Sequence, residues 1–235
     1  TNYCGWQVQP NGITIEGVLN RELSKLLKED IVVIGASRTD SGVHSYGNVA
    51  VFDTNARMPA EKISYALNQR LPYDIVVQNS SEIPLDWHPR HCNSRKTYEY
   101  RILNREFPMP QRRLDTWFVY RKLNIPAMCE AAEQFEGTHD FKSFCGNKKM
   151  KKSTVRTIEK IEFEQSGSRL HIYFTGNGFL QQMVRILTGT LIEVGQGKCA
   201  PDKITRILDA QDRQAAGPTA PAQGLFLVNV GYEDK

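Results

Sequence analysis

Apolar side chains recur at helical spacing near the start of the chain. Between residues 15 and 27 they fall every three or four positions, and Glu22 is the only polar member of the series. This spacing predicts an amphipathic helix over 15–27. Two short apolar runs follow at 31–34 and 49–52, and they predict strands on either side of a polar loop.

The pattern continues with a second helix and two more strands. Pro59 begins the helix, because proline favours the first helical turn, and the apolar run 75–77 predicts the next strand. Residues 94–104 alternate, with Tyr98 and Tyr100 on one face and polar or charged side chains on the other. Such alternation is typical of a strand with one buried face.

The second part of the chain has a similar rhythm. Two long runs at 154–164 and 168–175 predict a hairpin around Gly167. Apolar positions from 179 to 194 share one helical face and predict a helix. The other predicted elements are a strand at 117–119, helices at 127–135 and 201–210, and a final strand at 225–230.

Both parts therefore follow the order helix, strand pair, helix and strand, joined by residues 104–114. This order predicts an α+β fold of two related, mostly antiparallel sheet halves with helices packed on them and a central cleft. The N-terminal half spans 1–104 and the C-terminal half spans 115–235. Because the C-terminal half opens with a strand that the N-terminal half lacks, we expect a further strand to precede Thr1.

Composition narrows the class of protein. Of 235 residues, 40% are hydrophobic and 24% are charged, as in an ordinary globular domain. No apolar run approaches the roughly 18 residues of a membrane span, and no basic-then-apolar signal segment stands at the front. We therefore expect a soluble, cytoplasmic protein with no membrane partner.

Cysteine and histidine positions argue against a disulfide framework and a metal site. The five cysteines are widely spaced, and no Cys-x-x-Cys occurs, which indicates reduced intracellular thiols. The run from His88 to Cys92 lacks the second ligand pair that structural zinc needs. His139 and Asp140 lack the further histidines of a metal-dependent phosphohydrolase. We therefore expect no metal.

Two basic segments point to a polyanionic partner. Residues 142–156 carry six lysines and arginines and no acid, and residues 90–105 carry five against Glu99 alone. Tyrosine and phenylalanine are interleaved with them, which suits a nucleic acid with stackable bases. Charge alone leaves open the alternative of two solvated loops and a basic strand edge.

A glycine-flanked loop lies between the first two predicted strands. It reads Gly-Ala-Ser-Arg-Thr-Asp-Ser-Gly-Val-His over residues 35–44, and Asp40 is its only acidic residue. The phosphate-binding pattern Gly-x-x-x-x-Gly-Lys-Ser/Thr is absent, and a strand rather than a helix follows. A long hairpin loop whose Asp and Ser side chains bond their own backbone remains an alternative.

This loop closely resembles the signature of the tRNA pseudouridine synthase A family, Gly-x-x-Arg-Thr-Asp-x-Gly-Val-His. The resemblance runs from residue 3 to about residue 232. Its other segments are Tyr3-Cys4-Gly5-Trp6-Gln7, Arg95-Lys96-Thr97-Tyr98-Glu99-Tyr100, Asn177-Gly178-Phe179-Leu180-Gln181-Gln182-Met183-Val184-Arg185, and Gly217-Pro218-Thr219-Ala220-Pro221-Ala222-Gln223-Gly224-Leu225.

The resemblance implies a pseudouridine-synthase-like fold whose two halves form one catalytic unit. It implies an isomerase that modifies uridines 38, 39 and 40 in the anticodon stem-loop of tRNA. It also implies a homodimer. The reaction breaks the N1–C1′ bond, rotates the uracil and joins C5 to C1′, so all atoms stay with the substrate and no cofactor is expected.

The resemblance assigns the catalytic role to Asp40, which acts on a nucleotide taken out of its stack. Whether its carboxylate attacks a carbon or removes a ribose proton stays open. Tyr98 offers a ring for stacking on the uracil and a hydroxyl for proton exchange; the alternative is a core aromatic, which we expect of Tyr100.

Three further residues are candidates for substrate binding. Arg185 lies on an otherwise apolar helix face and needs a partner, which the resemblance implies to be Asp40. Arg38 is expected to grip phosphate or to help open the stem, and the alternative is a surface arginine. Leu225 ends the family's closing segment.

Two other functions stay open. The scaffold suits a non-catalytic RNA-binding module or tRNA chaperone, and a synthase with a different RNA target. The joint presence of Asp40, Tyr98 and Arg185 favours a catalyst over a binding module.

Overall fold

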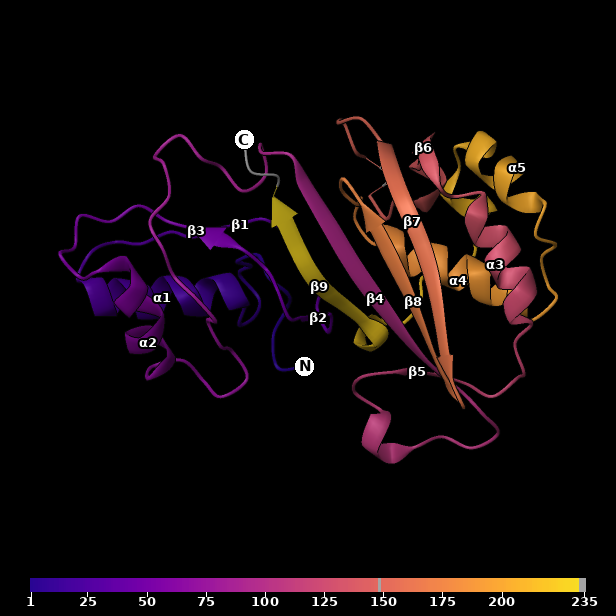
Figure 1. Ribbon diagram of the computed structural model, residues 1–235, viewed down its shortest axis with the longest axis horizontal. Helices are drawn as coiled ribbons and strands as arrows, with labels where there is room; N and C mark the ends of the chain where they lie inside the picture. Colours follow the sequence, from indigo (N-terminus) through magenta and orange to yellow (C-terminus); the bar gives the residue numbers. More distant parts are fainter. Residues whose placement is uncertain (148, 233–235) are drawn as a thin grey trace. The chain divides into compact units, whose positions relative to one another are not determined.

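The computed structural model describes residues 1–147 and 149–232, and these form two compact units (Figure 1). The first unit contains residues 1–42 and 48–93, and the second contains residues 43–47 and the chain from 94 onward. None of the helices formed by the described residues has both the length and the apolar character needed to cross a membrane. Lys148, part of the basic segment, lies outside the described residues.

The first unit is built on helix α1, Ile15–Leu27, as its spacing predicts. The Thr14 side chain caps its start by accepting a hydrogen bond from the Gly17 amide, and Lys28 ends it in a left-handed conformation. Helix α2, Ala60–Asn68, contributes Ile63 and Leu67 to the same apolar cluster. The α1 side chains in this cluster are Val18, Leu19, Leu23 and Leu27.

The strands predicted for the first unit are mostly wrong. The runs 31–34 and 49–52 form only a two-residue antiparallel pair, β1 (Ile34–Gly35) with β3 (Ala50–Val51), and 75–77 is not a strand. The physical reason is that side chains take the place of a neighbouring strand. The Ile31 amide donates to Ser24, and the Val33 amide donates to Asn20. Asn68 bonds both the amide and the carbonyl of Val77.

The second unit contains a seven-stranded sheet with strand order β2-β9-β4-β8-β7-β6, and β5 pairs with β4. The pairs β2–β9 and β4–β5 are parallel, and the others are antiparallel. The strands are β2 (His44–Ser45), β4 (Ser94–Asn104), β5 (Trp117–Val119), β6 (Gly137–Asp140), β7 (Val155–Ser166), β8 (Arg169–Gly176) and β9 (Leu225–Tyr232).

Three helices cover one face of this sheet: α3 (Ile125–Glu133), α4 (Met183–Gly195) and α5 (Lys203–Ala210), as Figure 1 shows. Helix α4 is the central one and buries nearly every residue. Its apolar side chains join those of β4, β7 and β8 in one core cluster. Short 3-10 turns complete the unit at η1 (Pro110–Arg112), η2 (Lys142–Phe144), η3 (Arg213–Ala215) and η4 (Ala222–Gly224).

The α+β class is confirmed. The strands predicted at 94–104 and 117–119 have the predicted bounds, whereas the helix predicted from 179 begins at Met183, because Gln182 before it has a positive φ of 59°. The strand 94–104 lies in the sheet of the second unit. The structural relationship between the predicted halves 1–104 and 115–235 stays a prediction.

Candidate active site

Asp40 lies in the first unit, on the irregular loop that follows β1. Asp40 is half-buried, and Arg38, two residues earlier, is exposed. The loop is not held by its own Asp and Ser side chains alone, because residues from three other parts of the same unit bond to it. The alternative of a simple self-capped hairpin loop does not account for these contacts.

The N-terminal segment 3–6 is the first of these anchors. The Trp6 amide donates to the Thr39 carbonyl at 3.0 Å, and the Ser41 hydroxyl donates to the Tyr3 carbonyl at 3.2 Å. Gly5 has a φ of +83°, and a Cβ at this position would stand 2.7 Å from the Thr39 carbonyl oxygen. Glycine is therefore needed at residue 5 for both its conformation and the close approach of the loop.

The stem of the loop is held by two side chains from later in the unit. Arg90 donates from Nε to the Gly35 carbonyl at 2.7 Å. Asn48 bonds the Ser37 backbone with both ends of its amide group. Asn48 belongs to no motif, and Arg90 stands out in the sequence only as the first residue of a basic segment. Their role in holding the loop depends on tertiary contact, which the sequence patterns do not show.

Two arginines put positive charge beside this loop. Burial is the main cause that lowers the pKa of Arg90, and the charge of Arg38 lowers it further. The negative charge of Glu16 acts in the opposite direction and raises the pKa of Arg90. Arg38 is exposed, so its guanidinium is accessible to a phosphate group.

Tyr98 lies in the second unit on the central strand β4. Its ring meets that of Phe179 edge to face, with centroids 5.1 Å apart. The register between β4 and β9 shifts here: Thr97 pairs with Asn229 and Tyr98 pairs with Leu227, which leaves Val228 as the extra residue of a bulge. Bulges often redirect a side chain next to an active site.

Tyr100, two residues further along the strand, is a core residue as expected. Its side chain is completely buried, and its hydroxyl donates to the Pro221 carbonyl at 2.6 Å. Burial raises the pKa of this hydroxyl, and the nearby positive charge of Arg185 opposes the rise only in part. Tyr100 therefore stays neutral and holds the closing segment in place.

Arg185 is half-buried on the first turn of α4 and is joined to the closing segment by two hydrogen bonds. Its Nε donates to the Ala220 carbonyl at 2.7 Å, and the Ala220 amide donates back to the Arg185 carbonyl at 3.0 Å. The sequence predicted that this side chain needs a polar partner, but it did not identify the Ala220 carbonyl as that partner. The pairing of Arg185 with Asp40 stays a prediction.

The closing segment 217–225 is docked on the core of the second unit. The Gly217 amide donates to the Thr190 hydroxyl of α4 at 3.0 Å. Leu225, its last residue, is 6% exposed and begins β9. Leu225 thus packs chiefly in the core cluster, together with Tyr100.

The two basic segments differ in how free their charges are. Lys151 and Lys152 are exposed and line a cavity of about 510 Å³ with Lys142 and Arg213. In the other segment, Arg95 bonds Glu159 at 2.6 Å and Arg101 bonds Glu99 at 2.8 Å.

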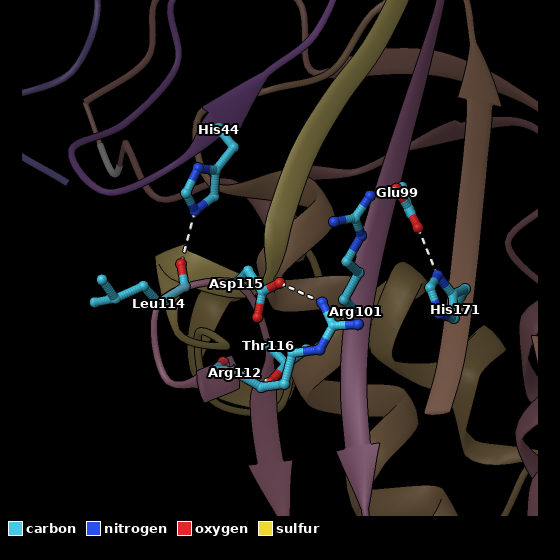
Figure 2. A network of polar contacts seen from close by, with 8 residues as sticks. All are labelled: His44, Glu99, Arg101, Arg112, Leu114, Asp115, Thr116 and His171. Atoms are coloured by element: carbon cyan, nitrogen blue, oxygen red, sulfur yellow. Dashed lines mark hydrogen bonds and ion pairs between the residues drawn. The ribbon is translucent and has the colours of Figure 1, made fainter. Parts of the chain in front are cut away.

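Arg101 belongs to a polar network in the second unit that the sequence patterns missed (Figure 2). Its guanidinium lies 3.8 Å from the Phe226 ring centroid, and its partner Glu99 also bonds His171. Arg112 bonds Asp115 at 2.6 Å in the same region. Two of the five basic side chains of the segment 90–105, Arg95 and Arg101, are therefore paired with carboxylates of the protein itself.

The sequence argues against two possible metal sites, the run from His88 to Cys92 and the pair His139 and Asp140. Within residues 1–147 and 149–232, no three His, Cys, Asp or Glu side chains are grouped closely enough to bind a metal ion. The rings of His88 and His91 stack on each other, with centroids 3.9 Å apart.

A family model described as tRNA pseudouridine synthase matches residues 1–91 and 131–233. The chain therefore belongs to the tRNA pseudouridine synthase family.

Similar curated proteins cover nearly the whole chain. It is 46% identical to the tRNA pseudouridine synthase A of Thermoanaerobacter sp. (strain X514) over 232 residues, which are 99% of this chain and 95% of that protein. It is 45% identical to the protein of the same name from Acetivibrio thermocellus, with the same coverage. For the one from Citrifermentans bemidjiense the identity is 46%, over 100% of this chain and 94% of the relative.

Proposed function

We propose that this protein isomerises uridines 38, 39 and 40 of the tRNA anticodon stem-loop and that Asp40 supplies the essential carboxylate. Its membership of the family makes it an enzyme that converts uridine to pseudouridine in tRNA. The observation that carries the role of Asp40 is the loop, which residues 3–6, Asn48 and Arg90 hold by hydrogen bonds at separate points along it. Rigid support of this kind is what a catalytic group needs.

The reaction exchanges one bond for another within a single nucleotide. The N1–C1′ bond breaks, the uracil turns and C5 bonds to C1′; the C5 hydrogen leaves as a proton and N1 takes up a proton, so the product is an isomer of the substrate. No atom is gained from a second substrate, and no electron is transferred. The protein must supply a carboxylate for the ribose or the base, a pocket for the extruded uracil and cations for the flanking phosphates.

The other candidate residues have distinct roles in this proposal. Tyr98 stacks on the extruded uracil, since its ring is half-buried and supported by Phe179. Arg38, with Arg90 behind it, contacts a phosphate next to the target nucleotide. Arg185 and Leu225 shape the substrate side of the second unit through the closing segment.

The basic segment 142–156 extends the RNA contact in this proposal. Its exposed lysines are suited to the phosphates of a tRNA helix. We also propose that the enzyme acts as a homodimer in the cytoplasm, where tRNA and reduced thiols are found. Light scattering coupled to size-exclusion chromatography tests the dimer: a molar mass of one chain at micromolar concentration contradicts it.

Tritium release from C5-tritiated tRNA transcripts tests the target. Uridine at position 38, 39 or 40 is kept singly, and the other two positions carry cytidine. We expect release from each transcript and none from one that lacks all three uridines. Release from the transcript without these uridines contradicts the anticodon target, and tight tRNA binding without any release supports the RNA-binding module.

A further inference from the structure

The stem of the Asp40 loop is a short antiparallel pair of chain segments. At its last position a side chain, that of Asn48, replaces the backbone partner. In β1 and β3, Ile34 faces Val51 and Gly35 faces Ala50. The next amide, that of Ala36, donates to the Val49 carbonyl at 2.7 Å. By the same register the next pair is Ser37 with Asn48.

At this last pair the Asn48 side chain takes the part of a backbone. The Ser37 amide donates to Asn48 Oδ1 at 3.2 Å, and Asn48 Nδ2 donates to the Ser37 carbonyl at 3.0 Å. The Val49 amide donates to the same Oδ1 at 3.0 Å. Since Ser37 is 5% exposed, loss of the amide group would leave its backbone groups without partners and away from water.

We propose that Asn48 is a positioning residue for catalysis: its amide fixes the Ser37 backbone and through it the direction in which the chain enters Arg38 and Asp40. This proposal rests on the proposed role of Asp40. A shift of about 1 Å in the backbone that carries a catalytic group can lower the reaction rate on the order of 100-fold. Substrate affinity depends on many other contacts and is affected much less.

The same unit contains a matched control. Asn68 bonds Val77 in the same two-ended way, with the Val77 amide donating to Oδ1 at 2.8 Å and Nδ2 donating to the Val77 carbonyl at 2.8 Å. This pair supports an extended segment that carries none of the candidate site residues. Asn68→Ala therefore removes the same chemistry without touching the loop.

The experiment compares Asn48→Ala, Asn48→Asp and Asn68→Ala for kcat, KM and melting temperature. We expect Asn48→Ala to lower kcat about 10- to 100-fold with KM within threefold, at a temperature where the variant is folded. Asn48→Asp keeps the acceptor but loses the donor to the Ser37 carbonyl, and we expect a smaller loss of kcat. Asn68→Ala should lower the melting temperature with kcat within twofold.

Two results would overturn the proposal. One is a kcat within twofold of the unchanged protein in both Asn48 variants. The other is an equal loss of kcat in Asn48→Ala and Asn68→Ala, which would indicate general destabilisation. Hydrogen exchange on all variants adds a second readout: the Ser37 to Ser41 amides should exchange faster only when Asn48 is changed. Turnover by Asp40→Asn would instead contradict the proposed function, so the two failures can be told apart.

Discussion

Gly5 lies close to the carbonyl of Thr39, the residue before Asp40. A Cβ on Gly5 would meet that oxygen at 2.7 Å and the Ser41 amide nitrogen at 3.0 Å. The glycine in the N-terminal motif thus allows the loop backbone at Thr39 to Ser41 to approach residue 5 closely. A residue with a side chain at position 5 must push the loop away.

Gly5→Ala should therefore lower kcat by at least tenfold, because the displaced backbone carries Asp40. Steady-state kinetics of tritium release measures this. Gly167→Ala is the control, since Gly167 also has a positive φ, of 59°, but nothing lies within 4 Å of an added Cβ. Gly167→Ala should cost about 1–2 kcal/mol of stability and leave kcat unchanged. Equal loss of activity in both variants would show that backbone strain alone is responsible.

Replacing Arg185 with lysine should impair catalysis although the charge is kept. In Arg185, Nε donates to the Ala220 carbonyl while the other two nitrogens of the planar guanidinium can donate to a second partner. The single ammonium group of lysine cannot reproduce both directions. We expect kcat to fall at least tenfold. Arg206→Lys, on the exposed side of α5, is the control and should be neutral. Full activity of Arg185→Lys would leave the guanidinium with no role beyond its charge.

Affinity for tRNA should fall steeply with salt, because bound lysines displace counterions from phosphates. Changing Lys148, Lys149, Lys151 and Lys152 together to glutamine should flatten the plot of log affinity against log salt by several units of slope if each contacts a phosphate. A filter-binding or fluorescence titration measures the slope. An unchanged slope would mean that the run is only a solvated loop. The charge-matched control changes four exposed lysines elsewhere: Lys62, Lys122, Lys160 and Lys203.

Glu99 should make stability depend on pH at the acid end. Burial opposes its ionisation, but hydrogen bonds from Arg101 and His171 outweigh burial and lower its pKa. A lowered pKa in the folded state contributes stability that is present at neutral pH and is lost as the pH falls below the ordinary value of about 4.5.

Glu99→Gln should therefore reduce the melting temperature at pH 7 and flatten its decline between pH 5 and pH 3. Differential scanning calorimetry across this range checks the change. Glu162→Gln alters a carboxylate that is 51% exposed and bonded to Lys160, so its profile should match that of the unchanged protein. A Glu99→Gln profile parallel to the unchanged one would contradict the role given to this network.

The spacing of apolar residues along the chain predicted the elements that bury one apolar face. Residues 15–27 repeat at helical spacing because one face of α1 is buried. The alternation of 94–104 predicted the bounds of β4, although Glu99 and Leu103 on its other face are buried as well. The segments 31–34 and 75–77 have the composition of strands, but their amides bond Ser24, Asn20 and Asn68. Pattern alone does not distinguish an extended segment held by side chains from a strand.

The candidate site shows the same division. The signature loop contains Asp40 and Arg38 within ten consecutive residues, so the motif alone found them. The supports Gly5, Asn48 and Arg90 lie outside these ten residues, and their role in holding the loop becomes visible only through their contacts. The pairing of Glu99 with Arg101 had a signal, because residues two apart on a strand share a face.

The most direct test of the central claim is tritium release by Asp40→Asn. The amide keeps the shape of the side chain but supplies neither a nucleophile nor a base. The control is Asp53→Asn, an exposed acid of the same unit. We predict that Asp53→Asn matches the unchanged protein, and that Asp40→Asn binds tRNA with unchanged affinity and releases no tritium. Turnover by purified Asp40→Asn above the level of contaminating enzyme would contradict the account.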